Sequence, residues 1–230
     1  MNRLELAQNL RSDAGISGSD NTTIDPTGEW ADVVRWVDRA WKDIQVRHKG
    51  TWNWMRSSVS FTTIASQNEY NPTAAPMSLT DFGNWVAYSF RVYSGGDTGN
   101  QLDLAHWQSY EQFRASYLIG SLATAASRPN DVVISPSKSI ILYPTPVDTS
   151  FTVTADYYRK PQVLALDADE PDMPEEFHEA ILYRALMFAS QVEGATDDYA
   201  IGQKEFNRLY AQLMADQLPR MVVNRRGGAI

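Results

Sequence analysis

Residues 151–158, FTVTADYY, mark the point where a β-rich middle of the chain gives way to helices. The odd-numbered residues of this stretch are apolar or aromatic and alternate with more polar ones, which is the period of a strand with one buried face. Pro161 cannot donate to a strand ladder, so the strand must end before it. The acidic, proline-punctuated residues 167–174 then predict an exposed connection.

Two helices are predicted beyond that connection. The first begins at Pro174, which suits the first position of a helix, and Glu175 and Glu176 favour its first turn. Gly194 ends it, and Thr196 caps the second helix. The apolar stripes are Phe177, Ala180, Ile181, Ala185, Phe188, Ala189 and Val192 in the first helix and Tyr199, Phe206, Leu209, Tyr210, Leu213 and Met214 in the second. Because the connection is short, the helices should pack as an antiparallel hairpin.

The beginning of the chain also predicts helices. Residues 2–11 have helical spacing, but an isolated helix of this length is marginal and needs a surface to lie against. A long helix opens at Asp25-Pro26-Thr27, with its apolar stripe at Trp30, Val33, Val34, Val37, Trp41 and Ile44. Trp36 and Ala40 lie off that stripe and indicate a second contact surface. That surface belongs either between subunits or inside a thick bundle.

The middle of the chain predicts short strands separated by turn residues. The expected strands are Ser57 to Ile64, Asn84 to Tyr93, Val132 to Ile134, Ser139 to Tyr143 and Phe151 to Tyr158. One amphipathic helix, around Trp107 to Tyr117, interrupts them. Residues 94–99 lack the lysine and the strand-to-helix context of a phosphate loop and instead predict a hairpin loop.

These elements predict an α+β fold. A helical bundle, made of the long N-terminal helix and the C-terminal hairpin, would hold an inserted antiparallel β module, because the apolar stripes before and after the module must bury each other. The predicted domains are residues 1–56 with 161–218, the module 57–160, and an extended, basic C-terminal arm, 219–230.

The composition excludes several classes of protein. The 230 residues include no cysteine, so disulfides and thiolate sites are excluded. A net charge of -8 disfavours a sequence-specific nucleic-acid binder. No apolar run reaches the length of a membrane span and no secretory signal is evident, which predicts synthesis in the cytoplasm without membrane contact. The 7 tryptophans and 11 tyrosines suit either partner surfaces or a large core.

The sequence contains no recognisable catalytic set. His48, His106 and His178 lack the spacing of metal ligands, and His178 is expected at the surface or in an interface. Counted from Asp167, a calcium loop would place Asp172 at its glycine position, so a solvated acidic loop fits better. The sequence therefore predicts no cofactor, no metal and no enzyme. The 28 acidic residues leave a carboxylate pair for glycan hydrolysis as the alternative.

The order of these features resembles the head-to-tail adaptor family of tailed bacteriophages. The residues that carry the resemblance are Trp52-Asn53-Trp54, Leu142-Tyr143-Pro144-Thr145-Pro146, Tyr157-Tyr158-Arg159-Lys160-Pro161, the acidic loop 167–174 and Pro174-Glu175-Glu176-Phe177-His178-Glu179-Ala180-Ile181. Together they span Glu29 to Asp216.

The resemblance implies a structural protein of the virion neck. It implies a dodecameric ring that docks on the portal protein, extends the DNA channel without binding DNA specifically, and presents a surface to a tail, nozzle or tail-fibre component. In this interpretation the C-terminal arm reaches along the portal. Its expected contact residues are Arg220, Met221, Val222, Val223, Arg225, Arg226 and Ile230. A virion-associated cell-wall glycan hydrolase is the alternative function.

Overall fold

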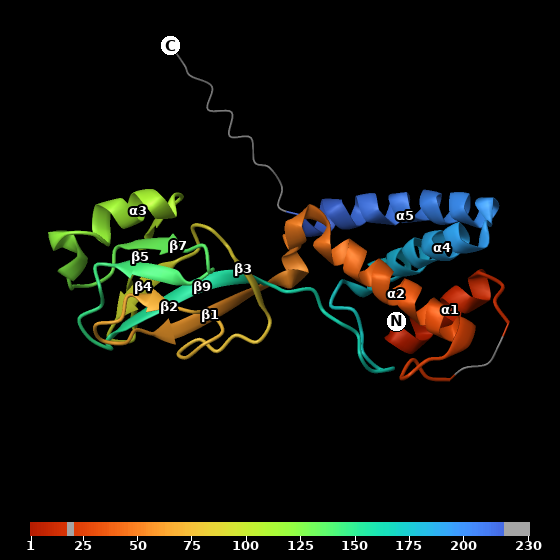
Figure 1. Ribbon diagram of the computed structural model, residues 1–230, viewed down its shortest axis with the longest axis horizontal. Helices are drawn as coiled ribbons and strands as arrows, with labels where there is room; N and C mark the ends of the chain where they lie inside the picture. Colours follow the sequence, from red (N-terminus) through yellow and green to blue (C-terminus); the bar gives the residue numbers. More distant parts are fainter. Residues whose placement is uncertain (18–20, 219–230) are drawn as a thin grey trace, which may run out of the picture. The chain divides into compact units, whose positions relative to one another are not determined.

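The computed structural model describes residues 1–17 and 21–218, which form two compact units (Figure 1). One unit comprises Met1–Met55 and the described chain from Pro161 onward, and it is built from helices. The other comprises Arg56–Lys160 and contains two sheets and one α-helix. The predicted α+β class is therefore confirmed. The second unit begins and ends on paired strands, since Arg56 lies opposite Tyr158. Its two chain ends are thus neighbours, which is the geometry that an insertion requires.

The described part of the helical unit contains four α-helices and three short 3-10 helices. The α-helices are α1 (Arg3–Asp13), α2 (Gly28–Val46), α4 (Glu179–Glu193) and α5 (Thr196–Gln217), and the 3-10 helices are η1 (Arg47–Gly50), η2 (Asn53–Met55) and η4 (Glu175–Phe177). Helix α4 contacts α1, α2 and α5, so it lies at the centre of the unit.

Helix α1 packs against α2 and α4 of its own unit. Asn2 and Glu5 form a capping box that closes its first turn. Leu6, Ala7 and Leu10 are completely buried against α2 and α4. The surface that this short helix needs is therefore supplied by the chain itself.

The hairpin of α4 and α5 has the short connection that the sequence predicts. Gly194 ends α4 in the left-handed conformation, with φ 73°, which a glycine adopts without steric cost. Gly202 lies where α5 passes close to α4, because a Cβ there would lie 3.1 Å from the carbonyl oxygen of Tyr183. The absence of a side chain at this position permits the close approach.

Two predicted helix starts are wrong. Pro174 precedes the 3-10 helix η4, whose tight turns are closed by bonds from Phe177 N–H to Pro174 O and from His178 N–H to Glu175 O. The α-helix begins only at Glu179. Thr196 is the first residue of α5 and not its cap, and Ala195, which precedes it, offers no side-chain acceptor.

The second contact surface of α2 lies inside the unit. Trp36 and Ala40 are 5% and 0% exposed, so the internal alternative is correct. Five of the seven tryptophans, at positions 30, 36, 41, 52 and 85, are buried. Core packing therefore accounts for most of the tryptophan content.

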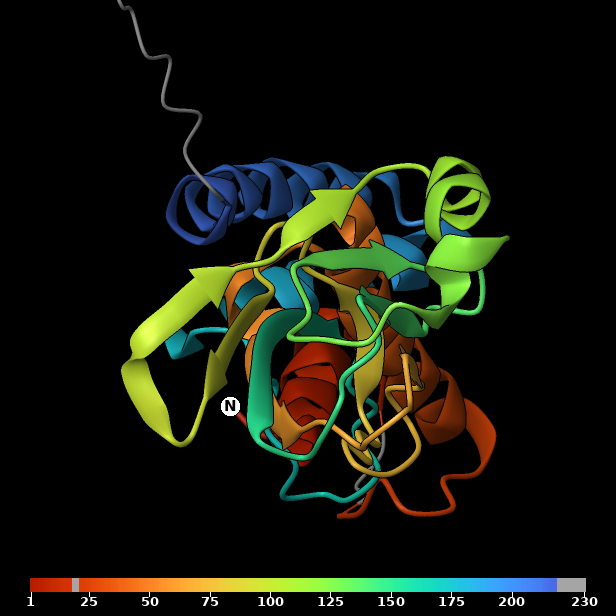
Figure 2. The same cartoon turned by 90° about the vertical axis from the view of Figure 1, so that its left-hand side faces the viewer.

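The inserted unit contains two sheets. Sheet A has the order β1 (Arg56–Thr62), β9 (Phe151–Arg159), β4 (Arg91–Ser94) and β5 (Asp97–Asp103), with β3 (Phe82–Trp85) also paired to β9; sheet B has the order β2 (Glu69–Tyr70), β8 (Ile140–Tyr143), β7 (Asp131–Ile134) and β6 (Ala105–Trp107). The strands β6 and β7 are parallel, so the unit is not purely antiparallel as predicted. Figure 2 shows the β4–β5 hairpin in yellow-green at the edge of its sheet.

The predicted strand from Asn84 to Tyr93 is divided in two. Its halves, β3 and β4, pair with different parts of β9. Between them the chain turns at Tyr88, which has φ 63°, and Val86 N–H bonds to the carbonyl oxygen of Asp156 at 2.9 Å. Alternation in the sequence did not reveal this turn, because both halves are apolar enough to belong to one strand.

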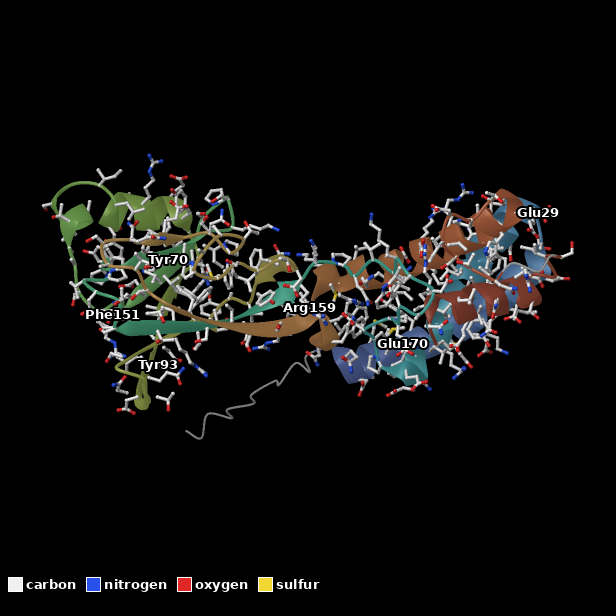
Figure 3. The ribbon with its side chains drawn as sticks, turned by 90° about the horizontal axis from the view of Figure 1, so that it is seen from below. Glu29, Tyr70, Tyr93, Phe151, Arg159 and Glu170 are labelled. Carbon is white, nitrogen blue, oxygen red and sulfur yellow. The ribbon has the colours of Figure 1, made fainter. Side chains whose placement is uncertain are left out.

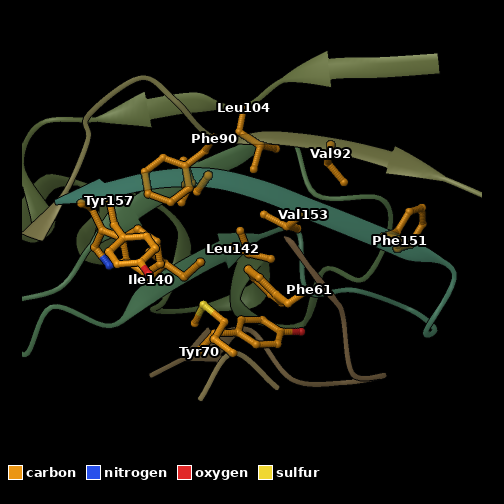
Figure 4. Packing of buried hydrophobic residues seen from close by; sticks show 14 residues of the cluster. Phe61, Tyr70, Phe90, Val92, Leu104, Ile140, Leu142, Phe151, Val153 and Tyr157 are labelled. Atoms are coloured by element: carbon orange, nitrogen blue, oxygen red, sulfur yellow. The ribbon is translucent and has the colours of Figure 1, made fainter. Parts of the chain in front are cut away.

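The core of the inserted unit lies between the two sheets (Figure 4). Phe61, Val92 and Val153 of sheet A pack with Ile140 and Leu142 of sheet B. The other face of sheet B is covered by α3 (Tyr110–Tyr117), which is followed by η3 (Ser121–Thr124), and Phe113 of α3 packs on Val133 and Ile141. Because both faces of sheet B are covered, β7 and β8 have consecutive apolar residues.

Candidate interaction surfaces

The histidines occupy unrelated environments. His48 is exposed on η1, and His106 packs in the inserted unit, where burial lowers its pKa and favours the neutral ring. His178 is 3% exposed, so its predicted surface position is wrong. Its Nε2 lies 2.9 Å from the carbonyl oxygen of Met173, and its Nδ1 lies 2.8 Å from the amino nitrogen of Met1. These two contacts give it a packing role between α1 and the start of α4.

The acidic connection after Pro161 is more ordered than a solvated loop. Asp167 Oδ1 accepts bonds from the amide and the hydroxyl of Thr23, each at 2.6 Å. Asp169 Oδ2 accepts the amides of Ala165 and Leu166 at 2.7 and 2.8 Å. Glu170, in contrast, is exposed on the same connection (Figure 3). Across residues 1–17 and 21–218, no group of three or more acidic or histidine side chains is placed to hold a metal ion.

Arg3 ties this connection to both α1 and α2. Its guanidinium pairs with Asp38 at 2.7 Å and donates to the carbonyl oxygens of Thr23 and Ala165 at 3.3 and 3.0 Å. The Arg3 side chain is 10% exposed and that of Asp38 is 39% exposed. Segments far apart in the sequence are thus joined through one buried cation.

The Asp167 bonds predict loss of stability in acid. The hydroxyl and amide of Thr23 hold the pKa of Asp167 below its ordinary value of 3.8. The stabilisation is therefore present above about pH 4 and is lost as the pH falls through the lower pKa of the folded state. We expect Asp167→Asn to reduce the acid dependence of the melting temperature between about pH 4 and pH 2, measured by circular dichroism.

Glu170→Gln is the matched control for that experiment, because it removes an exposed carboxylate from the same connection. It should leave the pH dependence close to that of the unchanged protein. If the melting temperature falls equally with pH in the unchanged protein, in Asp167→Asn and in Glu170→Gln, the Asp167 carboxylate has no stabilising role.

A basic surface on the helical unit lies over aromatic rings, of which Phe188 and Phe206 are buried. Three arginines of α2, η1 and α4 stack on rings of α4 and α5, and we call this set, with its one acidic residue, the arginine-aromatic face. Its members are Arg39, Asp43, Arg47, Arg184, Phe188, Phe206 and Tyr210.

The stacking distances in the arginine-aromatic face are short. The guanidinium carbons of Arg39 and Arg184 lie 4.1 and 4.5 Å from the ring centre of Phe188. Those of Arg47 and Arg184 lie 5.2 and 5.6 Å from the ring centre of Phe206. Such distances are within the range of cation–π attraction. The rings therefore favour the observed positions of the guanidiniums.

Asp43 is the one carboxylate of this face. Its Oδ2 accepts from Arg47 and from Arg184, each at 2.9 Å. Arg39 is exposed and makes no ion pair with any residue of the described chain. The face thus carries more positive than negative charge, although the whole protein is acidic.

The inserted unit has exposed features of another kind. Ile119 and Leu122, after α3, are 61% and 50% exposed. A polar groove of about 600 Å³ crosses sheet A and is lined by Arg56, Arg91 and Asp156 among others. Arg56 and Arg91 are already paired, with Asp156 and Asp103 respectively. The groove therefore offers mainly hydroxyl groups to a partner.

The arm residues predicted to contact a partner, Arg220, Met221, Val222, Val223, Arg225, Arg226 and Ile230, lie outside the described residues. The arginine-aromatic face was not predicted. The signal for it was present in the basic residues Arg35, Arg39 and Lys42 of the long helix and in the spacing of Arg184 and Phe188. The prediction of helix packing from apolar stripes does not include such polar positions.

Comparison with known proteins identifies the chain's family. A model of the SU10 adaptor protein family matches residues 1–229, which includes the whole stretch that resembles phage head-to-tail adaptors. A search of curated proteins found no match. None of the described helices has the length and apolar character needed to cross a bilayer. The chain belongs to the SU10 adaptor protein family, and this membership gives it a structural, adaptor role in a phage particle.

Proposed function

We propose that the chain forms a ring beneath the portal of a tailed phage, extends the DNA channel, and provides the attachment surface for the tail. The observation that carries the proposal is the family match over residues 1–229. An adaptor family favours this role over glycan hydrolysis. The net charge of -8 also suits a channel wall, because a negative surface lets DNA slide past without gripping it.

In this proposal the helical unit supplies contacts between copies, and the C-terminal arm docks on the portal. The arm combines Arg220, Arg225 and Arg226 with the apolar Met221 and Val222. Extended segments of this composition bind along a partner through backbone bonds and side-chain pockets. The proposed ring is dodecameric.

Mass measurement with purified portal tests the proposal. We expect mainly a single chain of 25.9 kDa in isolation, with only transient contact between copies, and a portal assembly that gains a ring of copies when the two are mixed. Deletion of residues 219–230 should abolish docking and leave the far-ultraviolet circular dichroism of the described units unchanged. If the truncated chain docks like the full chain, the arm is not the portal contact.

A charge-matched control separates the arm from general electrostatics. Replacing Arg220, Arg225 and Arg226 with serine should weaken docking strongly. Replacing the three exposed arginines at positions 91, 114 and 208 removes the same charge from the body and should weaken it little, since exposed ion pairs contribute little. If neither the full chain nor any of its variants adds mass to the portal, the proposed ring is wrong.

A further inference from the structure

We propose that neighbouring copies bind each other through oppositely charged faces of the helical unit. The arginine-aromatic face of one copy receives the exposed glutamates Glu175, Glu176 and Glu179 of the next, which we call the glutamate face. This inference rests on the proposed ring and specifies the contact that closes it.

The arginine-aromatic face is prepared to bind carboxylates. Asp43 is shared by Arg47 and Arg184, and Arg39 has no acidic partner within the described chain. Arg39 lies over the Phe188 ring, and the planar fork of a guanidinium can donate two N–H groups to one carboxylate. Because the Phe188 ring favours one position of Arg39, less side-chain entropy is lost on binding than for a free arginine.

The glutamate face belongs to a stretch of chain that has acidic residues and no lysine or arginine. Between Lys160 and Arg184 the chain has seven acidic residues and no lysine or arginine. Asp167 and Asp169 of this stretch are engaged within their own unit. The three glutamates of the glutamate face are exposed, so their carboxylates are available to another molecule.

The two faces project from different sides of α4. Glu179 and Arg184 are five residues apart, which on an α-helix corresponds to a rotation of about 140°. A contact between two different faces is heterologous and continues from copy to copy, whereas a contact of a face with itself gives a two-fold dimer. Pairing of these faces is therefore suited to a ring.

A second copy of the chain suits the arginine-aromatic face better than a DNA duplex does. A DNA duplex would have to approach an acidic protein through a face in which two of the three arginines, Arg47 and Arg184, already share one carboxylate. Affinity for DNA grows with the number of phosphates neutralised, and few cations are available here. Every neighbouring copy, in contrast, brings its own glutamate face.

Disulfide trapping without portal tests the contact in the full chain, which has no cysteine of its own. Lys42→Cys places a thiol on exposed α2 beside Arg39, and Glu176→Cys places one in the glutamate face. Mixed under mild oxidation, the two variants should form the mixed disulfide about tenfold faster than Lys42→Cys does with the control Asp97→Cys, because docking raises the effective concentration of the thiols. A chain that carries both cysteines should form a ladder of covalent oligomers.

Charge reversal identifies the cause of the trapping. Arg39→Glu in the Lys42→Cys copy should slow the mixed disulfide to the control rate, and Glu179→Lys in the Glu176→Cys copy should restore it. Salt should slow the reaction as well, since exposed charges are screened over about 10 Å at 0.1 M.

The inference would be overturned if the mixed disulfide formed no faster than the control pair of Lys42→Cys with Asp97→Cys, while the circular dichroism of the variants stayed normal. Loss of binding to a labelled DNA duplex on Arg39→Glu, in the absence of trapping, would assign the face to nucleic acid instead. These measurements involve no portal, so a chain that traps as expected but never docks would contradict the proposed function and not this contact.

Discussion

Trp41→Ala should lower the free energy of unfolding of the helical unit by about 3 to 5 kcal/mol, the usual cost of removing a buried tryptophan. Trp41 lies on the apolar stripe of α2 and is 1% exposed. The substitution leaves a cavity that the surrounding helices fill only in part, so lost transfer energy and lost contacts add together. Urea denaturation followed by far-ultraviolet circular dichroism measures this loss, since the helices dominate that signal.

Two further variants test the mechanism. Val46→Ala removes an apolar side chain from the last turn of the same helix, but Val46 is 49% exposed, so the change should stay within about 0.5 kcal/mol. Trp41→Phe should cost less than Trp41→Ala, because it keeps a ring and removes an indole N–H that has no acceptor among the described residues. Equal effects of the Trp41→Ala and Val46→Ala changes would contradict the burial of Trp41.

Arg3→Met should lower the stability of the helical unit by about 2 to 3 kcal/mol, somewhat less than breaking a fully buried ion pair. Methionine keeps most of the length and apolar volume of the side chain. It leaves Asp38 without its cation, and the carbonyl oxygens of Thr23 and Ala165 without their donor. The 39% exposure of Asp38 lets water solvate the carboxylate, which limits the loss.

Arg35→Met is the matched control for Arg3. It breaks the pair of Arg35 with Asp32, whose side chains are 68% and 46% exposed, and exposed pairs contribute less than about 1 kcal/mol. Hydrogen exchange should show faster exchange of the α1 amides in Arg3→Met, because α1 loses its side-chain bonds to α2 and to the connection before α4 and keeps only the backbone bonds to that connection. Unchanged protection of α1 would mean that its buried leucines hold it without Arg3.

An inserted unit changes how an adaptor can evolve and assemble. The strands β1 and β9 bring the two ends of the inserted unit together, so its loops can change without altering the helices. The helical unit holds the arginine-aromatic and glutamate faces, while the inserted unit presents exposed apolar residues such as Ile119 and Leu122. Under the proposed function, contacts between copies and contacts with a further component of the particle would be made by separate units.

Much of the secondary structure follows from local pattern. The six-residue stripe of α2 determined which side of that helix is buried, and the alternation at residues 151–158 determined the face of β9 that packs in the core. Gly194 determined the end of α4, because the left-handed conformation there is available to glycine at no cost. These properties depend on residues close together in the chain, so the sequence by itself was enough.

The tertiary structure alone decided the features that depend on distant residues. The burial of His178 depends on contact with the beginning of the chain, and the division of the strand around Tyr88 depends on how β9 is shared between β3 and β4. The arginine-aromatic face exists because Asp43, Arg184 and Phe206 come together from three elements. Local periodicity fixes the direction of a side chain relative to its own helix or strand, but which groups meet it, and with what charge, is fixed only when the elements pack.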